Sequence, residues 1–93
     1  TYIDSVNYKG EEISHIINPK TLENISNLNI LVSVIHDKCS IADALATGLL
    51  AMHTDDIIKF SNSNNIASML VLFDDKRIEK FYSKSFIKFL SED

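Results

Sequence analysis

Hydrophobic positions along the chain fall into short runs, and their spacing predicts strands first. Residues 2–8 alternate loosely up to Lys9-Gly10, and residues 11–17 resume as an extended run, which together indicate a β-hairpin. The Asn18-Pro19 pair predicts the end of the second strand, because proline lacks a backbone donor and restricts the residue before it. Residues 20–29 are polar and predict a loop.

Two apolar runs rich in β-branched residues predict buried strands on either side of a helical region. They cover residues 30–35 (ILVSVI) and residues 68–73 (SMLVLF). Between them, residues 41–52 are apolar on nearly every side, which is typical of a helix buried on several faces. Ser40 is the expected N-cap of this helix, with Asp43 three residues later as an approximate capping box.

The remaining pattern completes an α+β domain. A second helix is predicted after Thr54, ending at about residues 62–65, and residues 76–82 alternate like a strand that returns after a turn at Asp74-Asp75. Residues 86–90 are apolar enough to dock, but their pattern does not distinguish strand from helix. The order β-β-β-α-α-β-β predicts a mainly antiparallel sheet packed against two helices.

Composition narrows the possible functions. The 93 residues suffice for one modest core, and 45% hydrophobic with 24% charged residues is typical of a folded domain. A net charge of -4 with scattered basic residues argues against nucleic-acid binding. No apolar run approaches the roughly 20 residues that span a bilayer, and no secretory signal is visible. The start at Thr1, without methionine, leads us to expect a fragment of a longer protein.

Asp43 and Thr47 are the two polar side chains in the apolar helix, and they lie four residues apart on one face. Two interpretations remain open. In the first, Asp43 bonds back to the backbone at Ser40 and Thr47 bonds the carbonyl of Asp43. In the second, the carboxylate and hydroxyl oxygens together bind a hard cation, Mg²⁺ or Ca²⁺.

The three histidines and the single cysteine also carry candidate chemistry. His15 is expected at a strand end beside a rigid break, where an imidazole at a cleft rim could act as a base or could be a structural hydrogen-bonder. His36 and His53 are expected at the surface or as caps. Cys39 cannot form an internal disulfide and is expected to pack as a small hydrophobe near the helix start.

Two segments carry distinctive motifs, HIINPKT at residues 15–21 and CSIADALAT at residues 39–47, with A-D-A-L-A-T intact. Together they resemble the C-terminal signatures of the ApbE family of FAD:protein FMN transferases. The resemblance spans essentially the whole chain. It implies that residues 1–93 are a C-terminal domain or fragment of a transferase, incomplete without an N-terminal portion.

The resemblance also implies a reaction and a site. The parent protein would transfer FMN from FAD to a Thr or Ser hydroxyl of a target protein, with release of AMP. Asp43 and Thr47 would bind Mg²⁺ or Ca²⁺, and His15 would contact FAD and act as general base. The family's export to the cell envelope would place the parent on the periplasmic side, and the isolated 93-residue chain is expected to be inactive.

Two positions depart from the family's pattern after the first signature. Leu22 and Asn24 stand where the family has glycine and proline, so the loop beside His15 could be rebuilt. These departures motivate one alternative, a non-catalytic module that binds a flavin nucleotide or a protein. A second alternative is an FAD pyrophosphatase, in which a transferase site that lacks its acceptor uses water instead.

Overall fold

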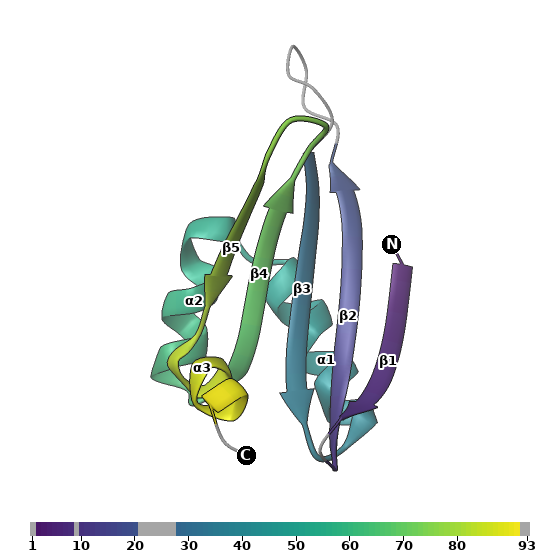
Figure 1. Cartoon of the computed structure of the whole chain (residues 1–93), viewed down its shortest axis with the longest axis vertical. Coiled ribbons are helices and arrows are strands. Elements are labelled where there is room, and N and C mark those ends of the chain that lie inside the picture. Colours follow the sequence, from purple (N-terminus) through teal and green to yellow (C-terminus); the bar gives the residue numbers. More distant parts are fainter. Residues whose placement is uncertain (1, 9, 21–27, 92–93) are drawn as a thin grey trace.

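The structure is a computed structural model that describes residues 2–8, 10–20 and 28–91, and Figure 1 shows its five strands and three helices. In chain order the elements are β1 (Tyr2–Tyr8), β2 (Glu11–Lys20), β3 (Leu28–His36), α1 (Cys39–Leu50), α2 (Thr54–Ser63), β4 (Ala67–Phe73), β5 (Ile78–Tyr82) and α3 (Lys84–Ser91). The predicted α+β class and order of elements are confirmed. The undecided tail forms a third helix, α3.

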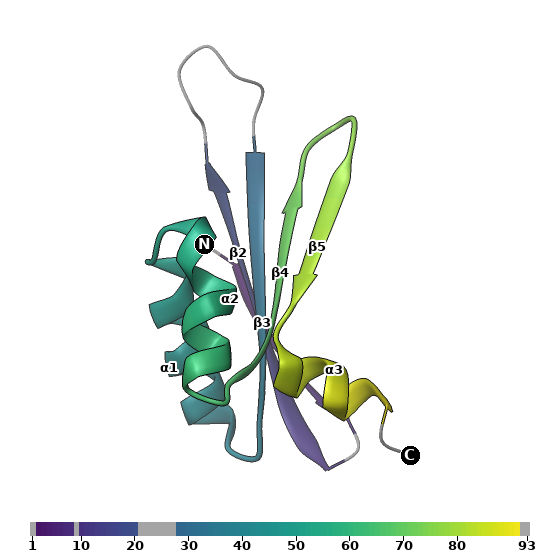
Figure 2. The ribbon, with the colours of Figure 1, turned by 90° about the vertical axis from the view of Figure 1, so that its left-hand side faces the viewer.

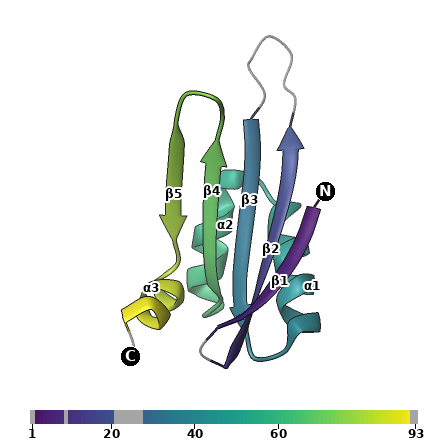
Figure 3. The ribbon, with the colours of Figure 1, turned by 45° about the vertical axis from the view of Figure 1, so that its right-hand side comes forward.

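The described strands form one antiparallel sheet in the order β1-β2-β3-β4-β5, with β1 and β5 at its edges, as Figure 3 shows. Each strand pairs with its neighbour in sequence, because short connections favour antiparallel hairpins. Only the β3–β4 connection is long, and it contains α1 and α2. The mainly antiparallel sheet is therefore confirmed.

The helices cover the two faces of the sheet unequally. Figure 2 shows α1 and α2 on one side of the sheet and α3 on the other. We call the side toward α1 and α2 the inner face; Ile16, Val32 and Leu70 lie on it in register and pack with Ala46 of α1. The opposite side, the outer face, carries α3 near one end, where Phe86 is buried. The two predicted helices thus share one face.

Strand β2 runs through Pro19 to Lys20, so the predicted break at Asn18-Pro19 is wrong. The described pairs with β1 end at Ile17, whereas the pairs with β3 continue to Lys20. At Pro19 the strand therefore has a described neighbour on one side only. Proline is tolerated at such an edge position, because its nitrogen carries no hydrogen and a strand paired on one side needs fewer backbone donors. The predicted loop at residues 20–29 is shortened at both ends, and Leu22 and Asn24 lie outside the described residues.

The core lies between the inner face and α1, and Leu49 of α1 is 2% exposed within it. We expect Leu49→Ala to lower the free energy of unfolding by about 2–5 kcal/mol, because the truncation leaves a cavity. Urea denaturation measures the change. The matched control is Leu90→Ala on α3, where Leu90 is 54% exposed and the change should stay within about 0.5 kcal/mol. Equal losses in the two variants would contradict this placement of the core.

Asp74 lies in the turn between β4 and β5, where the sequence predicted a turn, and its side chain stabilises this turn. Its Oδ1 accepts hydrogen bonds from the backbone N–H of Lys76 at 2.8 Å and of Arg77 at 3.0 Å. These bonds, the Lys76 bond foremost, favour the charged carboxylate and hold the pKa of Asp74 below its usual 3.8.

The lowered pKa of Asp74 predicts a pH-dependent contribution to folding. A carboxyl whose pKa is lower in the folded state stabilises the fold above its unfolded pKa, and the contribution disappears as the pH falls through the folded pKa. We expect Asp74→Ala to be less stable than the wild type near neutral pH and to converge with it in acid. Urea midpoints measured from about pH 6 down to pH 2 test this, and a constant difference would contradict it.

The helices in the described part of the chain all lack the length and hydrophobicity that a membrane span requires.

Candidate functional site

Asp43 lies on α1 and points its carboxylate at the inner face of the sheet. Oδ1 accepts a hydrogen bond from the Ser14 hydroxyl of β2 at 2.5 Å, and Oδ2 lies 3.9 Å from the sulfur of Cys39. The side chain is half-buried, whereas Ser14 is fully buried. Among the described residues, no basic side chain forms an ion pair with Asp43. The described partners of this carboxylate, a hydroxyl and a thiol, are therefore both neutral donors.

The predicted capping box at Ser40 is wrong. Helix α1 begins at Cys39, and its N-cap, Lys38, makes no side-chain cap hydrogen bond. Ser40 lies inside the helix and is exposed. The carboxylate of Asp43 bonds to Ser14 across the sheet–helix interface, because a fully buried hydroxyl on β2 also needs a partner.

Thr47 follows Asp43 by one helical turn and is exposed to solvent. Its hydroxyl donates to the backbone carbonyl of Asp43 at 2.8 Å, as the first interpretation of the pair predicted. This bond uses the hydroxyl proton and leaves the lone pairs of the oxygen, which can accept a hydrogen bond or bind a cation. Thr47 and Asp43 thus present oxygen atoms from adjacent turns of α1.

His15 lies in the middle of β2 and not at its end, because the strand continues through Pro19. It pairs in register with Ser33 of β3, and its Nδ1 lies 2.6 Å from the Ser33 hydroxyl. Ser33 is fully buried and His15 is half-buried. The imidazole is consequently anchored on one ring nitrogen.

Asp43 and His15 lie on opposite sides of the sheet. Consecutive residues of a strand point to opposite faces, and Ser14, which contacts Asp43, immediately precedes His15. Ser33 likewise sits between Val32 and Val34, which pack in the core beneath α1. The structure therefore brings Asp43 and Thr47 together and places His15 on the outer face, away from them.

The donor set at Asp43 fits a hard cation but does not complete its coordination. Carboxylate and hydroxyl oxygens suit Mg²⁺, which is usually held by one or two carboxylates together with water and substrate phosphates. In the part of the chain that the structure describes, no group of three His, Cys, Asp or Glu side chains could hold a metal ion. Asp43 and Thr47 are thus at most two ligands of such a site.

Ser14 and Ser33 belong to the candidate site as hydrogen-bond partners of predicted site residues, and the sequence did not predict them. Both are fully buried polar residues in strands, and each bonds to one predicted site residue. The alternation in β2 was a usable signal: with Ile16 in the core, Ser14 has to face inward and His15 outward.

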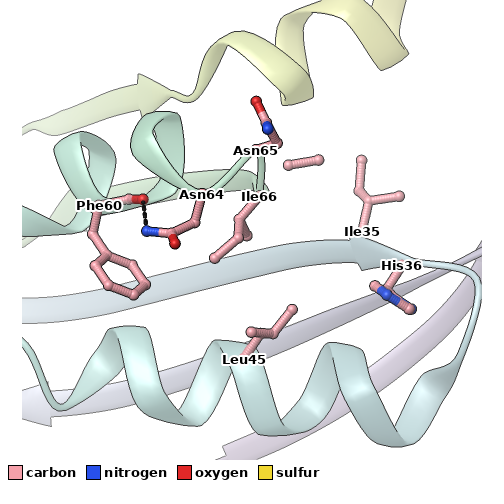
Figure 4. A pocket seen from close by; sticks show the side chains of 8 residues that line it. Ile35, His36, Leu45, Phe60, Asn64, Asn65 and Ile66 are labelled. Carbon is pink, nitrogen blue, oxygen red and sulfur yellow. Dashed lines mark hydrogen bonds between the residues drawn. The ribbon is translucent and has the colours of Figure 1, made fainter.

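A separate hollow of about 440 Å³ lies between α1, the C-terminal end of α2 and the start of β4, and Figure 4 shows its side chains. It is lined by Ile35, His36, Leu45, Phe60, Asn64, Asn65, Ile66 and Ala67. Asn64 donates to the carbonyl of Phe60 at 2.9 Å, so this amide is already partly used. None of the predicted site residues lines this hollow.

The other two histidines lie as expected, whereas Cys39 contacts the Asp43 carboxylate through its thiol and does not pack only as a small hydrophobe. His53 is the N-cap of α2, where its ring accepts a hydrogen bond from the backbone of Asp55 at 3.3 Å. His36 accepts from the backbone of Lys38 at 3.0 Å. Cys39 is a half-buried thiol at the first position of α1.

Comparison with known proteins places these residues in a wider context. Residues 1–70 match the ApbE family, a match that includes His15, Asp43 and Thr47. An FAD:protein FMN transferase from Vibrio cholerae serotype O1 is 35% identical over 83 residues, which are 89% of this chain and 25% of the relative. The chain thus spans about a quarter of the length of that relative.

Solved structures share the fold. The apo form of the Pseudomonas stutzeri flavinyl transferase ApbE superposes with a TM-score of 0.75 at 15% identity, covering 99% of this chain and 38% of that one. The flavin transferase ApbE from Vibrio cholerae superposes with a TM-score of 0.61 at 16% identity, covering 94% of this chain and 37% of that one. At these identities the likeness supports the α+β architecture alone.

Proposed function

The chain belongs to the ApbE family, and on that basis we propose that its parent is an FAD:protein FMN transferase, of which residues 1–93 form the C-terminal portion. The observation that carries this proposal is the 35% identity to such a transferase over 89% of the chain. In the proposed reaction, a Thr or Ser hydroxyl of a target protein attacks the FMN phosphorus of FAD. The bond from that phosphorus to the bridging oxygen breaks, AMP leaves, and the hydroxyl proton passes to a base.

Asp43 and Thr47 are the residues that we propose to hold Mg²⁺, or Ca²⁺ in its place. Their support is the oxygen donor pair on adjacent turns and the half-buried carboxylate without a described cationic partner. The remaining ligands would come from water, from the phosphates of FAD and from the rest of the parent. When bound, such a cation neutralises charge on the pyrophosphate oxygens and on departing AMP.

We propose two roles for His15. It contacts FAD, and it acts as the general base that takes the proton of the attacking hydroxyl. An imidazole that donates from Nδ1 to the Ser33 hydroxyl keeps a lone pair on Nε2, which can accept a hydrogen bond or a proton. His15 lies on the outer face and Asp43 on the inner face, so the role of general base requires a substrate that reaches both faces of the sheet. One substrate could meet both groups only by passing around an edge or an end of the sheet.

A flavin-transfer assay tests the proposed function directly. The full-length parent is incubated with FAD, Mg²⁺ and a target protein that carries an acceptor threonine, and covalent flavin fluorescence of the target is measured. We expect the parent to label the target and the isolated 93-residue chain to leave it unlabelled. An unlabelled target with the intact parent would overturn the transferase proposal.

A second candidate is a non-catalytic module that binds a flavin nucleotide or a protein. The separation of His15 from Asp43 across the sheet favours it, because these groups do not form one reaction centre within this chain. Tight FAD binding by the parent without labelling of any target would support this candidate. Release of FMN and AMP without a target would instead identify an FAD pyrophosphatase.

The remaining partners follow from the same proposal. The chain would work with the N-terminal portion of its own parent, with FAD, and with a target protein that presents a Thr or Ser hydroxyl. From the family resemblance we also propose that the parent works on the periplasmic side of the cell envelope. Cell fractionation that recovers the parent in the cytosol would contradict this location.

A further inference from the structure

Ser14 is a fully buried hydroxyl at a position where the strand pattern calls for an apolar side chain. It lies on the inner face of β2 two residues before Ile16, which is 1% exposed, and opposite Val34, which is fully buried. An alanine or valine would satisfy this environment without a hydrogen bond. The hydroxyl is stable here because it donates to Oδ1 of Asp43.

This hydrogen bond joins two elements that are 29 residues apart in sequence. A carboxylate that bonds only to its own helix can rotate with its side chain, whereas a bond from the sheet fixes one oxygen relative to β2. An ionised carboxylate accepts at both oxygens and has about four lone-pair sites, so the Ser14 bond leaves capacity for a cation. Ser14 therefore orients the carboxylate without occupying all of its acceptor sites.

We propose that Ser14 is a positioning residue that aims the Asp43 carboxylate at the cation. This inference rests on the proposed function, since it assumes that Asp43 is a metal ligand. Groups that hydrogen-bond to metal-binding carboxylates orient them, and their loss typically lowers metal affinity by about 10–100-fold. Ser14 would then act through Asp43 and would touch neither FAD nor the target protein.

The test compares two substitutions of equal size in the full-length parent. Ser14→Thr keeps a hydroxyl. Ser14→Val introduces a side chain of the same shape as threonine but without the hydroxyl, so both substitutions add the same bulk to the β-strand. Titration calorimetry with Mg²⁺, carried out once without FAD and once with FAD present, measures the dissociation constant of the cation, because FAD phosphates are among its proposed ligands. We expect Ser14→Thr to bind Mg²⁺ much as the wild type does and Ser14→Val to bind it about 10-fold more weakly or worse.

A buried serine elsewhere separates positioning from general damage to the fold. Ser61 of α2 is fully buried, and its hydroxyl accepts from Ser68 at 2.6 Å, away from Asp43. Ser61→Ala should lower the melting temperature and leave the Mg²⁺ dissociation constant unchanged. Equal Mg²⁺ affinity in Ser14→Thr and Ser14→Val, with a wild type that binds Mg²⁺, would overturn the role of Ser14 alone. A wild type that binds no Mg²⁺ either with or without FAD would overturn the proposed cation site as well.

Discussion

Asp43→Asn in the full-length parent is expected to abolish measurable Mg²⁺ binding and to slow flavin transfer by about 10²–10³-fold, the usual loss when one electrostatic stabiliser of a transition state is removed. The asparagine oxygen can still accept the Ser14 hydrogen bond, so the fold should survive while the negative charge is lost. Calorimetry with Mg²⁺ and the rate of covalent flavin labelling measure the two effects separately.

Asp37→Ala is the matched control for Asp43→Asn. Asp37 precedes the same helix, but its side chain is 68% exposed, and its Oδ1 lies 2.8 Å from Nδ1 of His36. Its removal changes the net charge by the same amount and should leave both Mg²⁺ affinity and transfer rate near those of the wild type. Normal labelling by Asp43→Asn, or equal defects in the two variants, would rule out Asp43 as a metal ligand.

His15→Asn should show that the outer face acts on the reaction independently of the cation site on the inner side. The asparagine amide can replace Nδ1 as the partner of Ser33 but supplies no base. If His15 takes the proton, kcat should fall by about 10²–10⁴-fold, and if it only contacts FAD, the KM for FAD should rise instead. In either case Mg²⁺ affinity should stay unchanged, because the imidazole lies on the outer face.

The control for His15→Asn is His53→Asn, at the exposed N-cap of α2, where asparagine is itself a good cap. This variant should transfer flavin at the wild-type rate. Steady-state kinetics with varied FAD give kcat and KM for both proteins. Unchanged values of kcat and KM in His15→Asn would exclude both roles that we propose for this histidine.

Local patterns in the sequence were enough to predict most of the fold. The apolar runs at residues 30–35 and 68–73 became β3 and β4, and the helix after Thr54 begins where it was expected. Such patterns depend on neighbouring residues only. The end of β2 depends instead on where its neighbours pair, and so the local break predicted at Pro19 did not occur.

The candidate site was less accessible to sequence reasoning. The bond from Thr47 to the helix backbone was predicted and is present, whereas the roles of Asp43 and Thr47 as metal ligands stay predictions. One of the two interpretations of Asp43 gave its carboxylate a partner at the nearby Ser40, because capping rules consider only the same helix. The observed partner, Ser14, lies on a strand that folding brings alongside α1, and a contact of that range has no local signature.

The adjacency of Ser14 and His15 makes β2 intolerant of changes in length. A single inserted residue between Ile13 and Ser14 would turn the hydroxyl away from α1 and direct the imidazole at it, and it would also expel Ile16 from the core. Only a bulge that absorbed the extra residue within the strand could prevent this exchange. Natural or engineered length variation in this region should therefore be confined to the hairpin connection around Gly10, whose φ of 80° already marks a turn.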